Sequence, residues 1–155
     1  MRWRTVADPG VRGDLCARLC RLSADTPRRW GTLTAHEVLC HLGDATAMVL
    51  GDRPRVTPVD GGRRPLRKRL GLWSPLRWPH SLRTSPHYNP HALGTRPGAF
   101  AVDLVRAVDG LQRLGIAGDD AALEPAHGFF GAMSVRDWQR WAWKHTEHHL
   151  RQFGV

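Results

Sequence analysis

Residues 134–155 read SVRDWQRWAWKHTEHHLRQFGV, and this stretch predicts the helix against which the other elements pack. At 100° per residue its apolar and imidazole side chains share one broad stripe, while most of its charged side chains fall outside that stripe. The stripe holds Trp138, Trp141, Ala142, His145, His149 and Gln152, and the residues outside it are Arg136, Arg140, Lys144 and Glu147. Ser134 with Asp137 suits a helix start and Gly154 a helix end, so we expect an amphipathic helix over 134–152.

Two histidines of that stripe, His145 and His149, are four residues apart and therefore lie one turn apart on the same helix face. Neutral imidazole is a common ligand for zinc and its neighbours, and a catalytic metal site typically takes three ligands from the protein. A third candidate, His41, lies on the apolar face of a second helix predicted over 34–50, which starts with the capping-box sequence Thr34–Glu37. The alternative for His41 is an ordinary core histidine that binds no metal.

Neighbouring residues complete this candidate site. His148 stands beside His149 and is its rival as a ligand, while His127 is either a residue at the mouth of the pocket or an ordinary turn histidine. Glu37 and Asp44 share the side of the helix that carries His41, so we expect one of them to accept its second ring N–H. The histidines without ligand spacing are expected to be ordinary or surface residues: His36, His80, His87 and His91.

The helical period recurs in two further segments, which gives four predicted helices, over 9–23, 34–50, 97–115 and 134–152. No segment alternates between apolar and polar residues as a strand does, so we assign no strand. The link 52–97 holds eight of the 11 prolines, and its tryptophans and leucines supply apolar area to dock on the body, so we expect an ordered cover with a short helix over 65–72. The sequence thus predicts an all-α fold, a four-helix bundle with one long crossover, in a single domain over 1–155.

Composition limits the class of protein. The 155 residues are 41% hydrophobic and 24% charged, with no apolar run near the roughly 18 residues that span a bilayer. The first residues, MRWRTVADPG, lack the apolar region of a signal peptide, so we expect a cytoplasmic protein without a membrane partner. Cys16, Cys20 and Cys40 fit neither a disulfide framework nor a CxxC metal knuckle, so we expect reduced thiols.

The net charge of +9 raises the hypothesis of a nucleic-acid partner, because lysine and arginine release counterions from phosphates. However, only Lys68 and Lys144 are lysines among the 23 basic residues, and the arginines are spread along the chain. Only 63–69 is densely basic, and no nucleic-acid-binding signature accompanies it. A nucleic-acid-binding module is therefore the least favoured of the functions considered.

These residues resemble the DinB-like (YfiT-like) superfamily of metal-binding four-helix bundles. The resemblance rests on the Trp30 stretch, on the capped helix with His41 and Leu42, and on the terminal H-x-x-H-H-L-R-Q over 145–152. It covers nearly the whole chain. The loop sequence HGFFG from His127 and the end of the chain are more narrowly similar to an uncharacterised branch, a domain of unknown function.

The resemblance implies a divalent metal, Zn, Ni, Mn or Fe, held by His41, His145 and His149. Its characterised members include thiol S-transferases and isomerases that use thiols such as bacillithiol or mycothiol, and hydrolases. We therefore expect a metal-dependent enzyme acting on a small-molecule substrate with a low-molecular-weight thiol, or a hydrolase, and a homodimer stays an open alternative. The competing hypothesis is a metal-free structural bundle. A zincin is excluded, because Thr146 rather than glutamate follows His145.

Overall fold

The computed structural model describes residues 3–54, 60–80 and 82–155. Within these residues the chain is mostly helical. Its elements follow in the order α1 (Pro9–Leu19), α2 (Ala35–Val49), α3 (Pro65–Gly71), the 3-10 turn η1 (Pro86–Tyr88), α4 (Phe100–Ile116), β1 (Ala126–His127), β2 (Gly131–Ala132) and α5 (Val135–Phe153). The four predicted helices and the short helix in the link are all present. Residues 55–59 of the link lie outside the described residues.

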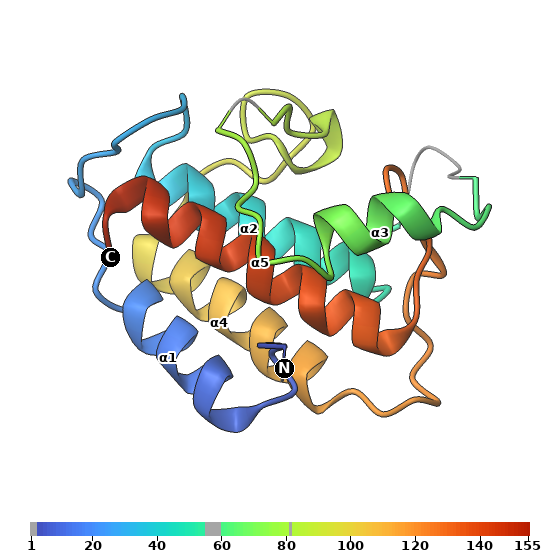
Figure 1. The fold of residues 1–155 in the computed structure, drawn as a ribbon. Helices are drawn as coiled ribbons and strands as arrows, with labels where there is room; N and C mark the ends of the chain where they lie inside the picture. The colour runs from blue at the N-terminus through green and yellow to red at the C-terminus, as the bar shows by residue number, and fades with distance from the viewer. Residues whose placement is uncertain (1–2, 55–59, 81) are drawn as a thin grey trace.

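The four long helices lie side by side (Figure 1), and contacts join α2 to α4, α1 to α4, and α5 to each of the other three. The colours in Figure 1 show that α2 and α4 run in one direction, and that α1 and α5 run in the opposite one. A long connection such as the one between α2 and α4 is what allows two successive long helices to lie parallel.

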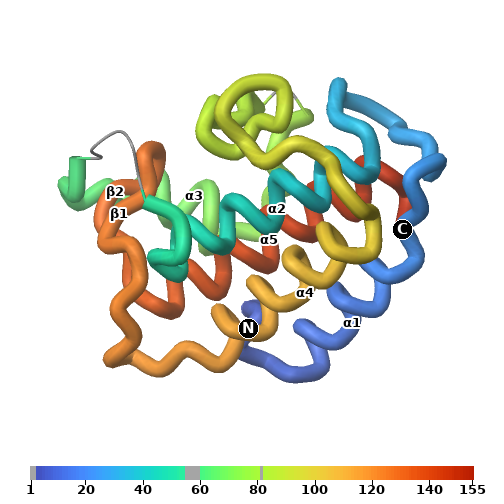
Figure 2. Tube along the Cα trace, turned by 180° about the vertical axis from the view of Figure 1, so that it is seen from behind, coloured from blue at the N-terminus to red at the C-terminus, as the bar shows by residue number. Residues whose placement is uncertain are grey.

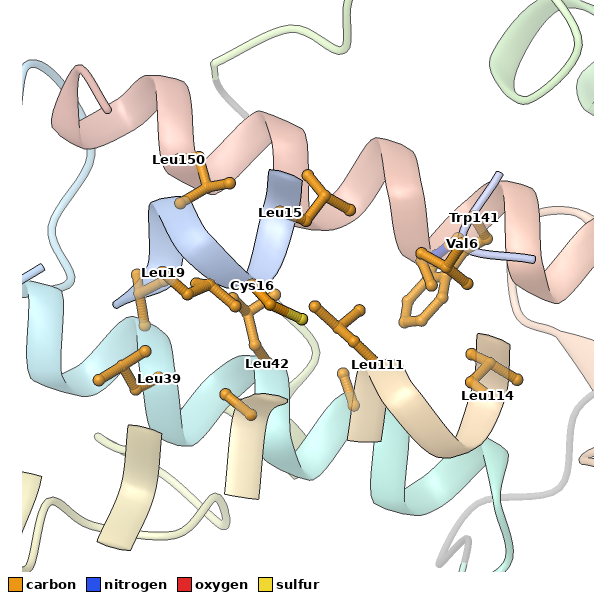
Figure 3. Packing of buried hydrophobic residues seen from close by; sticks show 14 of the residues in the cluster. Val6, Leu15, Cys16, Leu19, Leu39, Leu42, Leu111, Leu114, Trp141 and Leu150 are labelled. Carbon is orange, nitrogen blue, oxygen red and sulfur yellow. The ribbon is translucent and has the colours of Figure 1, made fainter. Parts of the chain in front are cut away.

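One apolar cluster joins these helices. Figure 3 shows Leu15 of α1, Leu42 of α2, Leu111 of α4 and Leu150 of α5 packed into it, and all four are buried. Each comes from the helical period of its own segment, and burial of such a stripe stabilises a helix more than its intrinsic propensity does. Trp138 and Trp141 are also buried there, with exposed fractions of 0% and 4%, as their place in the stripe predicts.

The helix ends follow from local hydrogen bonds. Thr34 with Glu37 and Ser134 with Asp137 form complete capping boxes at the starts of α2 and α5. Gly154 closes α5 at φ 74°, a left-handed conformation that glycine adopts without steric cost. The first helix ends at Leu19 rather than at the predicted residue 23, because the chain there tightens into i→i−3 hydrogen bonds.

The prediction that the chain has no strand is wrong. β1 pairs antiparallel with β2, with Ala126 opposite Ala132 and His127 opposite Gly131. Gly131 has φ 69°, and a Cβ at this position would meet the carbonyl oxygen of Gly62, so the turn requires glycine. The pairing spans two residues on each side, which is too short to leave an alternating pattern in the sequence.

The link between α2 and α4 covers one face of α2 and α5 (Figures 1 and 2). η1 contacts α2, and the backbone carbonyls of Leu72 and Ser74 accept hydrogen bonds from Arg140 of α5. The expected cover is thus present over the residues described. No helix in 3–54, 60–80 or 82–155 is long and apolar enough to cross a membrane.

Candidate metal centre

Three histidines from two helices meet beneath this cover. His41 comes from α2, and His145 and His149 come from successive turns of α5. Each offers one ring nitrogen, and the three nitrogens all lie within 4.8 Å of one another. His41 and His149 are buried and His145 is half-buried. The structure therefore brings together the three candidate ligands that the sequence predicts.

The hydrogen bonds of His41 fix its tautomer. Its Nδ1 lies 2.9 Å from the carbonyl oxygen of Tyr88, which can only accept, so Nδ1 carries the proton. In the neutral ring this leaves the lone pair on Nε2, which points to Nε2 of His145 at 2.8 Å. Ligand histidines usually donate their second N–H to such a carbonyl or to a carboxylate, which orients the ring.

The predicted acceptors for His41 were wrong. Glu37 accepts hydrogen bonds from the backbone of Thr34 and binds His91 instead. Asp44 accepts from Thr95 and pairs with two arginines of neighbouring segments. The 3-10 turn of the link reaches His41 with Tyr88, and helical spacing within α2 gives no information about that approach.

A second chain of hydrogen bonds orients His149. The amide nitrogen of Gln152 donates to the carbonyl oxygen of Trp30 at 2.8 Å. The other atom of that amide, Oε1, therefore faces His149 and accepts from its Nδ1 at 2.8 Å. Nδ1 of His149 is the protonated nitrogen, and its Nε2 keeps the lone pair. Gln152 belongs to the predicted stripe, but its part in orienting His149 is not visible in the sequence.

All three rings favour the neutral form. Burial lowers the pKa of His41, and it lowers the pKa values of His145 and His149 well below the ordinary value, with the other imidazoles of the cluster adding to the effect. Neutral imidazole is the form that binds a metal ion, because the lone pair is then available. Three neutral nitrogen donors suit Zn, Ni and Fe better than Mn, which favours oxygen ligands. The residues thus fit a divalent cation.

Aromatic rings surround the cluster. The ring of Trp141 lies 4.7 Å from the ring of His145, and Trp78 of the link lies 6.1 Å from it, between centroids. Trp138 packs on Trp141 at 5.3 Å. This apolar wall excludes water from one side of the three histidines and strengthens electrostatic interactions within the site.

The rival ligand His148 lies outside the cluster. Its ring contacts Trp30 and Trp78, at 6.1 and 6.3 Å between centroids, and burial lowers its pKa to about 4. His127 acts as a turn histidine, since its Nδ1 accepts a hydrogen bond from the backbone N–H of Phe129. Its ring packs on Trp138 and Trp141. Of the histidines expected to be ordinary, His80 stacks on Trp30 with centroids 3.8 Å apart.

A second group, which the sequence pattern does not reveal, joins His36 and Cys40 of α2 to Asp103 of α4. The Asp103 carboxylate binds His36 at 2.8 Å and accepts from the backbone of Gly98. Burial and the nearby Asp103 raise the pKa of Cys40 to about 12, so the thiol stays protonated. These side chains hydrogen-bond to one another and so link α2 to α4.

Two cations of α5 also depart from the prediction. Arg140 and Lys144 fall outside the apolar stripe, yet they are 2% and 7% exposed. The link covers this side of α5, and both side chains donate to its backbone carbonyls. Helical periodicity identifies the face that packs on other helices and does not identify a face that is covered by an irregular segment.

No protein-family model, no curated protein and no solved structure matches this chain.

Proposed function

We propose that this protein binds a divalent metal ion through His41, His145 and His149 and is a metal-dependent enzyme of the thiol S-transferase or hydrolase type. The proposal places the chain among DinB-like four-helix bundles. The pattern of four long helices with a long link supports that assignment, together with one histidine from α2 and an i, i+4 pair from α5. The substrate is a small molecule, with a low-molecular-weight thiol as co-substrate in the transferase case.

One observation carries this proposal. His41 and His149 each donate Nδ1–H to an acceptor on the outer side of the cluster, so both present an Nε2 lone pair to its interior. A satisfied core histidine needs no such matched orientation, whereas metal ligands need it. The acceptors come from separate segments, the Tyr88 carbonyl of the link and the Gln152 amide held by Trp30.

The chain's own residues set what the site can do. When bound, a divalent cation held by three neutral ligands keeps its full charge and lowers the pKa of a water or thiol at an open position. Tyr88 and Gln152 hold the two ligand rings in place, and the rings of Trp78 and Trp141 restrict water. Asp44, the carboxylate whose charge acts on His41, is occupied by Thr95 and two arginines, so in this proposal the activation rests on the cation.

A separate observation favours a second candidate function, that of a metal-free structural protein. The Nε2 atoms of His41 and His145 lie 2.8 Å apart, which is the distance of a direct N–H···N hydrogen bond. With His145 donating to His41, the pair is satisfied without a metal. The cluster would then be a polar link between α2 and α5 in a structural protein.

Elemental analysis of untagged purified protein distinguishes the metal-dependent enzyme from the metal-free structural protein. We expect about one equivalent of a divalent metal per chain, and loss of most of it in His145→Ala, because two imidazoles form a much weaker site than three. His148→Ala is the matched control, since His148 neighbours the cluster without joining it, and it should keep full occupancy. Metal retained in His145→Ala and lost in His148→Ala would show that the ligand set is wrong.

Activity is tested on the same proteins. Electrophiles are screened with several low-molecular-weight thiols, and simple esters and amides are screened without them. Thiol-dependent turnover in the loaded protein alone supports transfer, and thiol-independent turnover in the loaded protein alone supports hydrolysis. Equal rates in loaded wild-type protein and in His145→Ala would contradict a metal-dependent reaction.

A further inference from the structure

A separate cavity of about 290 Å³ lies on the side of α5 that the link covers. Its walls include Trp78 and Arg77 of the link, and Arg140, Trp143, Lys144 and Arg151 of α5. Its volume is near the lower end of the range for small-molecule sites. The pocket shares Trp78 and His148 with the surroundings of the histidine cluster but contains none of the three candidate ligands.

Two buried cations form the inner wall of this pocket, and among the described residues neither has a carboxylate partner. Asp137, one turn before Arg140, is paired with Lys68, and Glu147, one turn after Lys144, is paired with Arg18. Burial of a charge without an opposite charge is costly, and Arg140 and Lys144 are adjacent on one helix face, where like charges repel. Glu147 also lines the cavity, but its carboxylate is paired with Arg18, so among the described residues no carboxylate pairs with either of the two buried cations.

Backbone carbonyls account for part of the hydrogen-bonding capacity of these cations. Arg140 donates to the carbonyl oxygens of Leu72, Arg4 and Ser74, and Lys144 donates to those of Gly71 and Leu76, at 2.7 to 3.3 Å. Arginine has five N–H donors and the lysine ammonium has three. The hydrogen bonds among the described residues thus leave two donors of Arg140 and one of Lys144 for a ligand.

Indole rings make the rest of the wall flat and apolar. The guanidinium carbon of Arg140 lies 4.5 Å from the ring centroid of Trp143 and 5.0 Å from that of Trp3, so the cation contacts both indoles. Trp78 lines the same cavity, and its Nε1 is occupied by the carbonyl of Gly71. Exposed Arg77 and half-buried Arg151 add further positive charge.

We propose that this pocket binds a small molecule that carries a dianionic phosphate-type group on a flat, apolar body. The anion would lie against Arg140 and Lys144 and balance their two charges, and the body would lie against Trp78 and Trp143. A purely structural role, in which Arg140 and Lys144 cap the carbonyl end of α3, explains their hydrogen bonds to Leu72 and Gly71. That role leaves the two positive charges without a counterion. This site goes beyond the proposed metal centre, and its test does not depend on metal.

The test is isothermal titration of the full chain with phenyl phosphate at fixed ionic strength, with inorganic phosphate and benzyl alcohol as comparison ligands. We expect saturable binding of phenyl phosphate, weaker binding of inorganic phosphate and no binding of benzyl alcohol. His145→Ala should bind phenyl phosphate as the wild-type protein does, which separates this pocket from anion binding at a metal. Wild-type protein that binds no phenyl phosphate, or His145→Ala that has lost the binding, would overturn the assignment.

Variants locate the binding. Lys144→Met removes one buried cation at similar volume and should weaken phenyl phosphate about tenfold or more, the loss expected for one charge-assisted hydrogen bond. Arg77→Met, at an exposed position of the pocket wall, should weaken phenyl phosphate binding a few-fold, because exposed charges are screened. Arg21→Met, an equal charge change outside the pocket, should have no effect.

Two results would contradict the pocket assignment. Equal weakening by Arg21→Met and Arg77→Met would mean that only the net positive charge attracts the anion. Single-stranded DNA that binds more tightly than phenyl phosphate, with the same loss in Arg77→Met, would make this a nucleic-acid surface instead of a small-molecule site. Should Lys144→Met fail to fold, as judged by circular dichroism, the comparison of Arg77→Met with Arg21→Met still decides.

Discussion

At the scale of single residues, the amide of Gln152 determines which nitrogen of His149 faces the cluster. Its nitrogen is committed to the Trp30 carbonyl, so its oxygen accepts from His149. Replacement with leucine removes both hydrogen bonds at similar volume and allows the His149 ring to rotate. Loss of such an outer partner typically lowers metal affinity about 10- to 100-fold.

We therefore expect Gln152→Leu to bind zinc about 10- to 100-fold more weakly than the wild-type protein in competition with a chromophoric chelator. The matched control is Gln112→Leu, because Gln112 of α4 bonds Arg12 and Cys16 away from the cluster. Unchanged affinity in folded Gln152→Leu would show that the ring of His149 is oriented by packing alone.

The sequence predicts the three histidines but not the atoms that orient them, for a physical reason. His145 and His149 are placed by the spacing of one helix, and His41 by the apolar face of another. The acceptors that orient the rings, Tyr88 and Trp30 with Gln152, depend on how irregular segments cross these helices. Helical period carries no information on such crossings, so Glu37 and Asp44 were the predicted acceptors.

At the scale of elements, Asp137 ties the start of α5 to the segment that contains α3. Its carboxylate caps the backbone N–H of Ser134 and accepts from Nζ of Lys68 and Nε1 of Trp73 at 2.6 and 2.8 Å. Although burial opposes ionisation, these hydrogen bonds and the lysine charge lower the pKa of Asp137 below its ordinary value. The ionised carboxylate thus stabilises the folded chain.

The sign of the pH dependence follows. The contribution of Asp137 is present above the unfolded pKa near 3.9 and is lost as pH falls through the lower folded pKa. Asp137→Asn should lower the free energy of unfolding in urea by about 1–3 kcal/mol at pH 7, and the difference should shrink below about pH 4. Asp119→Asn, at an exposed position, should change it by less than about 0.5 kcal/mol. A difference for Asp137→Asn that persists unchanged at pH 3 would contradict the ionic origin.

The close approach of α2 and α4 gives a second test at this scale. A Cβ at Gly110 of α4 would lie 2.0 Å from Oγ1 of Thr46, whose hydroxyl is committed to the carbonyls of Leu42 and Gly43. Gly110→Ala should therefore cost about 1–3 kcal/mol through overpacking. Gly13→Ala in α1, where nothing lies within 4 Å, should instead gain about 0.5–1 kcal/mol from helix propensity. Chemical unfolding of both variants checks the opposite signs, and a gain for Gly110→Ala would mean that the helices lie further apart.

The helices and strands show which parts of the fold the helical period of the sequence predicts. All four helices were predicted because their apolar stripes pack on one another, and the capping boxes located two of their starts. The two-residue strands leave no pattern, and they form because Gly131 turns the chain back at positive φ. Arg140 and Lys144 fall outside the predicted stripe and are nevertheless buried, because the link that covers them has no period of its own.

At the scale of the whole molecule, the fold brings together histidines that are far apart in the chain. His41 and His145 are separated by 104 residues, and their Nε2 atoms lie 2.8 Å apart only because α2 and α5 pack side by side. An unfolded chain retains the i, i+4 pair at best, so it binds a metal ion far more weakly than the folded chain does. A ligand that binds the folded state preferentially stabilises that state by mass action.

Zinc should therefore raise the melting temperature of the metal-free protein. At a free concentration of about 100 times Kd the gain is about 2.7 kcal/mol, which for a chain of this size corresponds to roughly 5–11 °C. His145→Ala should show little of this shift, because its site keeps two ligands. His91→Ala, which removes an exposed histidine paired with Glu37, should keep the full shift and so controls for loss of an imidazole as such. Equal shifts of the melting temperature in His145→Ala and His91→Ala would mean that zinc binds elsewhere on the surface. A shift that is present in His91→Ala and absent in His145→Ala would tie the stability of the whole fold to this one cluster.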